Sequence, residues 1–311
     1  MQIPAVSIGS AVRRENFDAM IQSVFDSAAN LRLVHQNRLI TLLISDHYEL
    51  PQGIRINTKN LSLQSLTVGL RAASRGGILR FDSSPLAIDL RSASVWTCPI
   101  PELNTNMQSP DVIQAWSTAW ELLNRGQRSK NTEVVGNDLL QLNTGSLLSQ
   151  RLGKPVMGLI SSVESFDLQG ATRAAEKMIG LGPGVTPSGD DILIGFLAGL
   201  WSTAEEDSMH LSFIHSFADA LRQLAKQTNE ISRTYLYYAA QGQFSSSLST
   251  LAEAIAMGRQ VEQATQNAMR VGHSSGMDSV TGLLIGLCIW NKQIIPHPVT
   301  LPSGEREQEV T

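Results

Sequence analysis

A loop followed by an apolar helix occurs twice in this chain, and this internal repeat most constrains how the chain can fold. The pattern Ser188-Gly189-x-Asp191-x-x-x-Gly195-x-Leu197-x-Gly199-Leu200 is matched position for position between Ser275 and Leu287. From residue 188 to residue 275 the offset is a constant 87 residues. Such self-similarity predicts one loop-helix unit used twice. In the simplest arrangement, both helix starts face a shared cleft.

Four glycines inside the two repeated helices predict close packing between them. Gly195 and Gly199 stand four residues apart in the first helix, and Gly282 and Gly286 do so in the second. Residues four apart lie on one helix face, where a missing side chain lets two helices approach closely. Each helical glycine costs roughly 0.5–1 kcal/mol relative to alanine, so close packing is the expected compensation.

The loop before the first helix, Gly180-Leu-Gly-Pro-Gly-Val-Thr-Pro-Ser-Gly-Asp-Asp191, has the composition of a binding loop. Gly182 and Gly184 allow positive φ and a close approach of a ligand to the backbone. The helix start that follows presents unpaired N–H groups and the positive end of the helix dipole, which favour phosphate or carboxylate. The second copy lacks this glycine-rich insert. A structural turn remains the alternative.

The repeated serines and aspartates also fit a purely structural function. Ser188-x-x-Asp191 and Ser275-x-x-Asp278 match a capping box, in which both side chains satisfy free donors of the first helical turn. Thr186-Pro187 offers another helix start, with threonine as the N-cap and proline at the first helical position. Capping and ligand binding both stay open for these residues.

Two further segments carry polar groups that suit a cleft. Thr228, Asn229 and Ser232 lie at the junction between two helical patterns, where Thr228 or Asn229 could equally cap the following helix. His273 lies in the second repeated loop and could donate to a substrate oxygen or transfer a proton near neutral pH. A surface position is the alternative for His273.

The carboxylates of Asp190 and Asp191 would repel an anion bound beside them. Three arrangements resolve this conflict: a divalent cation such as Mg²⁺ between them, N–H groups of a ureido or amide ligand as their partners, or a capping role that faces away. The sequence does not choose among these, and no metal ligands are assigned. A Ser-His-Asp hydrolase is disfavoured because no strand-elbow context for a nucleophile is present.

Composition and charge exclude several classes of protein. The 311 residues carry a formal net charge of −4, so no basic field for nucleic acid or an anionic membrane is expected. The two cysteines, Cys98 and Cys288, form no zinc or disulfide pattern. The start of the chain lacks the features of a signal peptide. The apolar runs 192–201 and 280–290 are shorter than the ~20 residues that span a bilayer. We therefore expect a cytoplasmic protein without membrane segments.

Strand signals in the first third predict a small β-rich domain over residues 1–105, barrel-like or sandwich-like, with a helix near Glu15–Ala28. Two hairpins are expected, one joining 31–35 to 38–44 through Gln36-Asn37, the other joining 77–81 to 86–90. A segment rich in Pro, Asn and Ser, 99–110, marks the boundary. The fold class is thus α+β, with a mainly helical domain over 106–302.

The helical domain is expected to begin at Ser109-Pro110 with an amphipathic helix that Gly126 ends. Further helices are predicted at 139–152, 171–179, 187–203, 210–228, 231–241, 248–257, 261–270 and 276–291. The polar tail 303–311 is expected to be disordered.

The motifs together resemble those of a known protein family. They comprise the glycine-rich loop 180–191, Thr228-x-x-Ile-Ser232 followed by Gly242-x-Phe244, and Gly272-His-Ser-Ser-Gly-x-Asp278. This combination resembles a family, long catalogued as a domain of unknown function, that includes the AllH-type subunit of oxamate carbamoyltransferase. The resemblance covers most of residues 20–290 and is weakest in the β-rich half.

The resemblance implies a role in allantoin and purine breakdown. There, a complex of three different subunits converts oxalurate and phosphate into oxamate and carbamoyl phosphate. Because the chain lacks the arginine-bearing phosphate loop of ordinary carbamoyltransferases, we expect a carbamoyltransferase subunit that is inactive without its partner subunits. The alternative is a noncatalytic scaffold or effector-binding subunit. No cofactor is assigned with certainty, and Mg²⁺ is the one candidate.

The expected partners are the other subunits and a small anion: oxalurate, oxamate, phosphate or carbamoyl phosphate. Four residues are candidates for chemistry: Asp190, Asp191, His273 and Asp278. The candidates for substrate binding are Gly182, Gly184, Thr186, Ser188, Gly189, Thr228, Asn229, Ser232, Ser274, Ser275 and Gly276.

Overall fold

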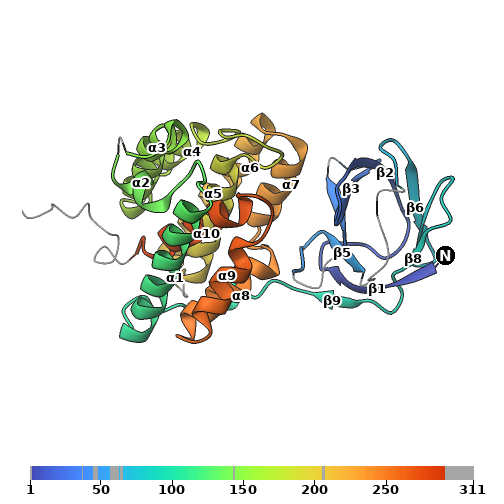
Figure 1. The fold of residues 1–311 in the computed structure, drawn as a ribbon, viewed down its shortest axis with the longest axis horizontal. Helices are drawn as coiled ribbons and strands as arrows, with labels where there is room; N and C mark the ends of the chain where they lie inside the picture. Colours follow the sequence, from blue (N-terminus) through green and yellow to red (C-terminus); the bar gives the residue numbers. More distant parts are fainter. Residues whose placement is uncertain are drawn as a thin grey trace, which may run out of the picture.

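The computed structural model describes residues 2–36, 38–44, 48–56, 63, 66–142, 144–204 and 207–290. A closed β-barrel at one end of the molecule is followed by a layered group of helices at the other (Figure 1). Each part has its own hydrophobic core. The α+β fold expected from the sequence is confirmed, and its β-rich part is a barrel.

Within the described residues, eight strands close the barrel and a ninth pairs beside it. The strands are β1 (Gln2–Gly9), β2 (Phe17–Val24), β3 (Ala28–Leu33), β4 (Leu39–Ile44), β5 (Gly53–Ile56), β6 (Arg71–Arg75), β7 (Ile78–Phe81), β8 (Ala87–Asp89) and β9 (Ser94–Trp96). Their order is β5-β4-β3-β2-β6-β7-β8-β1-β9, and antiparallel pairing of β1 with β5 closes the ring. Closure leaves the eight-stranded ring without an open edge.

The helix predicted near Glu15–Ala28 is wrong, because this segment forms strand β2. Phe17, Ala19 and Ile21 are buried while the residues between them are more exposed. That is the two-residue period of a strand and not the 3.6-residue period of a helix. Strand β2 pairs with β3 on one side and β6 on the other. Both predicted hairpins form, as β3 with β4 and β7 with β8, although Asn37 lies outside the described residues.

The helical part follows a short connection that begins to pack at Cys98 and Ile100. Its helices are α1 (Pro110–Ser129), α2 (Gly136–Leu140), α3 (Leu147–Glu164), α4 (Leu168–Glu176), α5 (Ser188–Ser202), α6 (Ser208–Leu224), α7 (Glu230–Ala239), α8 (Ser246–Ala256), α9 (Val261–Met269) and α10 (Ser275–Leu287), with short 3₁₀ turns at Ile100–Glu102 and Ala225–Gln227. No helix in this described part is long and apolar enough to cross a membrane. The tail 303–311 lies outside the described residues.

Several predicted helix boundaries are wrong, and α3 continues to Glu164, past the predicted end at residue 152. The helix expected at 139–152 is interrupted between α2 and α3, where Gly145 has a φ of +76° and the Ser146 hydroxyl accepts the Ser149 backbone N–H at the start of α3. Helix α1 continues past Gly126 to Ser129. An added Cβ on Gly126 would lie 3.3 Å from the Met269 side chain, so this glycine permits packing on α9.

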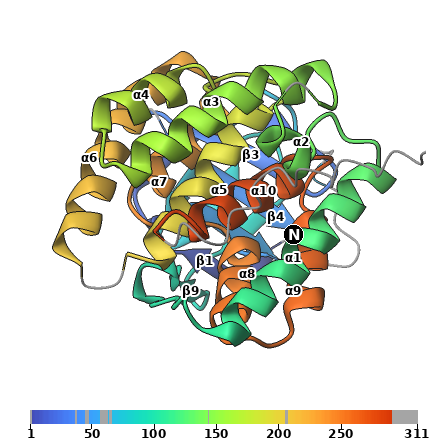
Figure 2. The same ribbon diagram turned by 90° about the vertical axis from the view of Figure 1, so that its left-hand side faces the viewer.

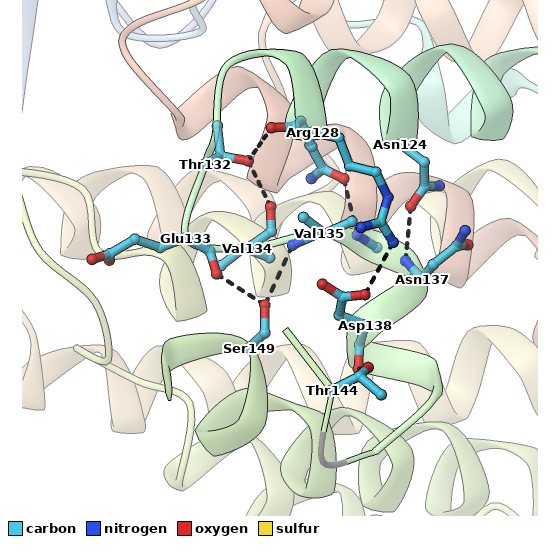
Figure 3. A network of polar contacts seen from close by, with 12 residues as sticks. Asn124, Arg128, Thr132, Glu133, Val134, Val135, Asn137, Asp138, Thr144 and Ser149 are labelled. Atoms are coloured by element: carbon cyan, nitrogen blue, oxygen red, sulfur yellow. Dashed lines mark hydrogen bonds and ion pairs between the residues drawn. The ribbon is translucent and has the colours of Figure 1, made fainter. Parts of the chain in front are cut away.

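Polar contacts fix the segment that joins α1 to α3 (Figure 3). The Asn124 side chain accepts the Asn137 backbone N–H at 2.8 Å, and Arg128 contacts Asp138 at 3.2 Å. Buried Gln127 accepts the Gly136 N–H and donates to Thr281 of α10, at 2.9 and 3.0 Å. These bonds satisfy buried backbone donors, and they hold α10 in position from one side.

The barrel and the helices contact each other through polar groups. The backbone N–H of Glu49 donates to the Ser246 hydroxyl at 2.7 Å, and the Ser246 N–H donates to the Glu49 carbonyl at 3.0 Å. Arg32 of β3 forms an ion pair with Glu230 at the start of α7. These contacts place strand β3 and the segment before β5 against the starts of α7 and α8.

Candidate functional site

Helices α5 and α10, the two copies of the repeat, cross the centre of the helical part, with the other helices around them (Figure 2). An added Cβ on Gly195 would lie 1.8 Å from the Ser279 carbonyl oxygen, and one on Gly282 would lie 2.0 Å from the Ile192 carbonyl oxygen. An added Cβ on Gly199 would lie 2.5 Å from the Leu287 nitrogen. From Gly195 to Gly199 along α5, the contacted residues of α10 also move toward its end. The two helices are therefore parallel, and their starts lie at the same end.

The two helix starts touch through their side chains. The hydroxyls of Thr186, before α5, and Ser275, at the start of α10, are 2.6 Å apart. Both hydroxyls also interact with the carboxyl group of Asp191. The shared position that the repeat predicted for the two helix starts is therefore present.

Neither helix uses the predicted capping box. Pro187 occupies the N-cap position of α5 and Ser274 that of α10, and neither makes a side-chain capping hydrogen bond. The rival prediction, with Thr186 as N-cap, also fails, by one position. Ser275 and Asp191 instead turn toward each other, which leaves both side chains available for a role other than capping.

Asp190 connects the repeat to the segment before α7. It is fully buried, and its carboxyl accepts the Gly180 N–H at 2.8 Å and the Thr228 hydroxyl at 2.5 Å. Burial raises its pKa, while these two bonds and Ser232 oppose the rise. Asn229 caps α7 by accepting the N–H groups of Ile231 and Ser232 at 3.0 and 3.1 Å. Asp190 thus holds the start of the Thr228–Ser232 segment in place from inside the protein.

Asp191 and Asp278 form a buried acidic pair, with exposed fractions of 4% and 1%. Burial and the charge of Asp278 raise the pKa of Asp191 well above its ordinary value. Burial, with a smaller contribution from Glu133, raises the pKa of Asp278 to about 7. Within the described residues, Asp191 Oδ2 and both carboxyl oxygens of Asp278 have no hydrogen-bond partner in good geometry, although Ser188 and Ser274 lie close enough to Asp278 to lower its pKa.

The raised pKa of Asp278 predicts a pH-dependent stability. Between its ordinary value of 3.8 and about 7, the folded chain binds more protons than the unfolded chain, so the free energy of unfolding falls as pH rises. A shift of this size corresponds to a loss on the order of 4 kcal/mol by pH 8. We expect Asp278→Asn to be more stable than wild type at pH 8. Its free energy of unfolding, measured by urea denaturation, should change less between pH 4 and 8. Because the pKa of Asp191 is raised as well, the free energy of unfolding of the variant still depends on pH to some extent. Parallel profiles for the two proteins would contradict this.

The predicted loop glycines have different surroundings. Gly182 has a φ of +125°, and an added Cβ would lie 2.7 Å from the Ser188 nitrogen. Gly184 has a φ of +91° with nothing within 4 Å. Gly189 and Gly276 pack against the carbonyl oxygens of Met178 and Ala268.

The first-turn N–H groups of α5 are largely occupied. Those of Gly189, Asp190 and Asp191 already donate to carbonyls of the preceding loop. These three N–H groups are therefore not available to a ligand.

A cavity of about 250 Å³ lies between the barrel and the helix starts. Among the predicted site residues, Thr186, Asp191, Ser275 and Gly276 line it. The structure does not bring His273, which is exposed, into its wall. Asp190, Asp278, Thr228, Asn229 and Ser232 do not line the cavity, although Ile231 of the same segment does.

Sequence reasoning missed the half of the cavity that the barrel and α7 supply. These residues include Asn30, Thr41, Tyr48, Gln52, Tyr235 and Tyr238. Thr41 gave a signal, because it is the polar residue of the otherwise apolar strand β4. Asn30 gave a weaker signal, since strand β3 also contains Arg32. Tyr48 and Gln52 gave none. Among the described residues, no group of three or more His, Cys, Asp and Glu side chains is arranged to hold a metal ion.

Two protein-family models match this chain. Residues 178–287 match the model described as oxamate carbamoyltransferase subunit AllH, and residues 4–95 match the AllH family N-terminal domain. The first contains both copies of the repeat, and the second contains the barrel as far as β9. No solved structure matches the chain. The chain therefore belongs to the AllH family, the oxamate carbamoyltransferase subunits of that name.

Proposed function

We propose that this chain binds the small substrate of an oxamate carbamoyltransferase complex in the cavity between barrel and helices. The observation that carries the proposal is the position of Asp191, a buried carboxyl with an unpartnered oxygen, in the wall of a cavity lined by both halves of the chain. Family membership supplies the reaction class. Loop N–H groups near Val185 and Thr186, at the cavity edge, are the proposed contacts for an anionic group.

The proposed reaction moves a carbamoyl group between oxalurate and phosphate. The bond between the carbamoyl carbon and the oxamate nitrogen breaks, and a phosphate oxygen bonds to that carbon. The nitrogen takes up a proton, so the products are oxamate and carbamoyl phosphate. Asp191 would orient the N–H groups of the substrate, and His273, next to Gly272 in the cavity wall, would assist the proton transfer. We place the reaction in allantoin breakdown in the cytoplasm.

A second candidate, a noncatalytic scaffold or effector-binding subunit, is favoured by one observation. No Lys, Arg or His is among the described residues that line the cavity, so any positive charge for phosphate would have to come from elsewhere. Another subunit that completes the site with a positive charge would favour the catalytic function. Mg²⁺ bound with the substrate would do so as well.

Partner dependence tests the proposed function. We expect no turnover from the isolated chain, no turnover from the remaining subunits alone, and phosphate-dependent carbamoyl phosphate formation from oxalurate when all are mixed. The assay couples carbamoyl phosphate to ATP production, with and without Mg²⁺. Full turnover by the remaining subunits without this chain would show that it does not contribute to the site.

Gly184 separates ligand binding from loop structure. We expect Gly184→Val to abolish binding of phosphate and oxamate in calorimetry while lowering the melting temperature only slightly. A valine at a φ of +91° costs roughly 1–2 kcal/mol, and an exposed loop can absorb this by rearranging. Gly69→Val is the matched control, since Gly69 is also exposed, has a φ of +90° and has nothing within 4 Å, but lies in the barrel. Equal binding by the two variants would remove the loop from the site.

A further inference from the structure

The cavity between the domains has one wall from each half of the chain. Gln52, which precedes β5, belongs to the barrel wall, and Asp191 of α5 belongs to the helical wall. The remaining surface is mostly apolar. A ligand bound here would therefore contact both halves, and its few polar contacts would determine its orientation.

Most polar groups in these walls already have partners. The Tyr235 hydroxyl interacts with Thr41, and the Thr41 hydroxyl donates to the Asn30 side chain at 2.9 Å. Asn30 in turn donates to Ser23 at 3.0 Å. This chain of hydrogen bonds is complete within the protein and leaves no obvious polar contact for a ligand.

Among the buried side-chain oxygens of these walls, those of Gln52 and Asp191 are the exceptions. The side-chain oxygen Oε1 of Gln52 and the Oδ2 oxygen of Asp191 are both buried without a hydrogen-bond partner among the described residues. Their residues are only 1% and 4% exposed, so bulk water does not satisfy these oxygens either. Unpartnered buried acceptors are uncommon in native proteins, and two of them in one cavity suit a ligand that donates hydrogen bonds.

The Gln52 oxygen is a hydrogen-bond acceptor, and so is the Asp191 oxygen while its carboxyl is ionised. The group that fits them carries N–H donors and need not carry a charge. A carboxamide side chain can also present its NH₂ group, so Gln52 matches a ligand group that contains both N–H and C=O. A carboxylate group of a ligand is disfavoured at this position, because it would face the Asp191 carboxyl and no cation of the described cavity wall lies beside it.

We propose that Gln52 and Asp191 together bind the amide or ureido group of the ligand. The barrel then forms one half of the binding site, and Gln52 is a specificity-determining residue. This rests on the proposed function, in which the cavity receives the substrate. The amide or ureido end enters between the two walls, while the anionic end stays toward the loops before α5 and α10.

The test is calorimetry on the full chain with oxamate, oxalate and phosphate. Oxalate replaces the amide of oxamate by a second carboxylate at nearly the same size and has no N–H group. We expect oxamate to bind about 10-fold more tightly than oxalate or better, which corresponds to one or two hydrogen bonds. Gln52→Met, which keeps the side-chain length, should weaken oxamate binding by about 10-fold and leave phosphate binding unchanged. Gln150→Met, on the exposed surface of α3, is the control.

The outcomes separate this inference from the proposed function. If oxamate and oxalate bind the wild-type chain equally well, the inference is overturned while anion binding in the cavity stands. The same conclusion follows if Gln52→Met binds oxamate as the wild type does. If none of the three ligands binds even with the partner subunits present, the proposed function itself fails. The wild-type comparison decides the matter even if Gln52→Met does not fold.

Discussion

Gly195→Ala is expected to destabilise the chain by about 3 kcal/mol or more, because overpacking a close helix contact forces the backbone to move. The new Cβ would lie 1.8 Å from the Ser279 carbonyl oxygen and 2.8 Å from the Leu283 nitrogen, and both of these atoms belong to the rigid backbone of α10. No side-chain rotation relieves this contact. Equilibrium denaturation in urea, followed by far-ultraviolet circular dichroism, measures the loss.

The matched control is Gly158→Ala in α3. There the nearest atom to an added Cβ is the Ala174 side chain at 3.8 Å, an ordinary van der Waals contact. Since alanine favours a helix over glycine by roughly 0.5–1 kcal/mol, this variant should be neutral or slightly more stable. If both variants had the same stability, the close contact between α5 and α10 would not be the reason for the glycines.

Asp191→Ala is expected to lower the activity of the assembled complex by roughly 100-fold or more, the size typical of losing a group that takes part directly in a reaction. Asp191 is the predicted chemical residue that both lines the cavity and carries an unpartnered oxygen. Removing its charge also relieves repulsion with Asp278, so the variant should fold at least as well as wild type at pH 8. Lost activity would then report on the site and not on stability.

The repeat made the centre of the fold predictable from the sequence. Helical glycines four residues apart imply a close helix contact, and matching loops imply that the two helix starts lie together. Both features are present in the packing of α5 and α10 and in the contact of Thr186 with Ser275. These predictions succeeded because they depend on local spacing along the chain.

Features that depend on long-range pairing were not predictable in this way. Strand β2 looked helical because nothing local reveals its pairing with β3 and β6. The capping-box prediction was wrong because the Ser275 hydroxyl contacts Thr186, which is 89 residues away in the sequence. Gln52 could not be recognised either, since its partner wall lies in the other half of the chain. The functional roles of the predicted site residues stay predictions.

The most direct test of a substrate site at the starts of α5 and α10 is the activity of the reconstituted complex that carries Asp191→Ala and His273→Ala together. Exposed Asp219→Ala, on α6, is the control for a lost carboxylate. Size-exclusion chromatography confirms that each complex assembles, and carbamoyl phosphate formation from oxalurate is then measured. We predict that the doubly substituted complex assembles and loses its activity, while the control keeps it. Full activity from the doubly substituted complex would contradict a substrate site on this chain and leave the scaffold function as the better explanation.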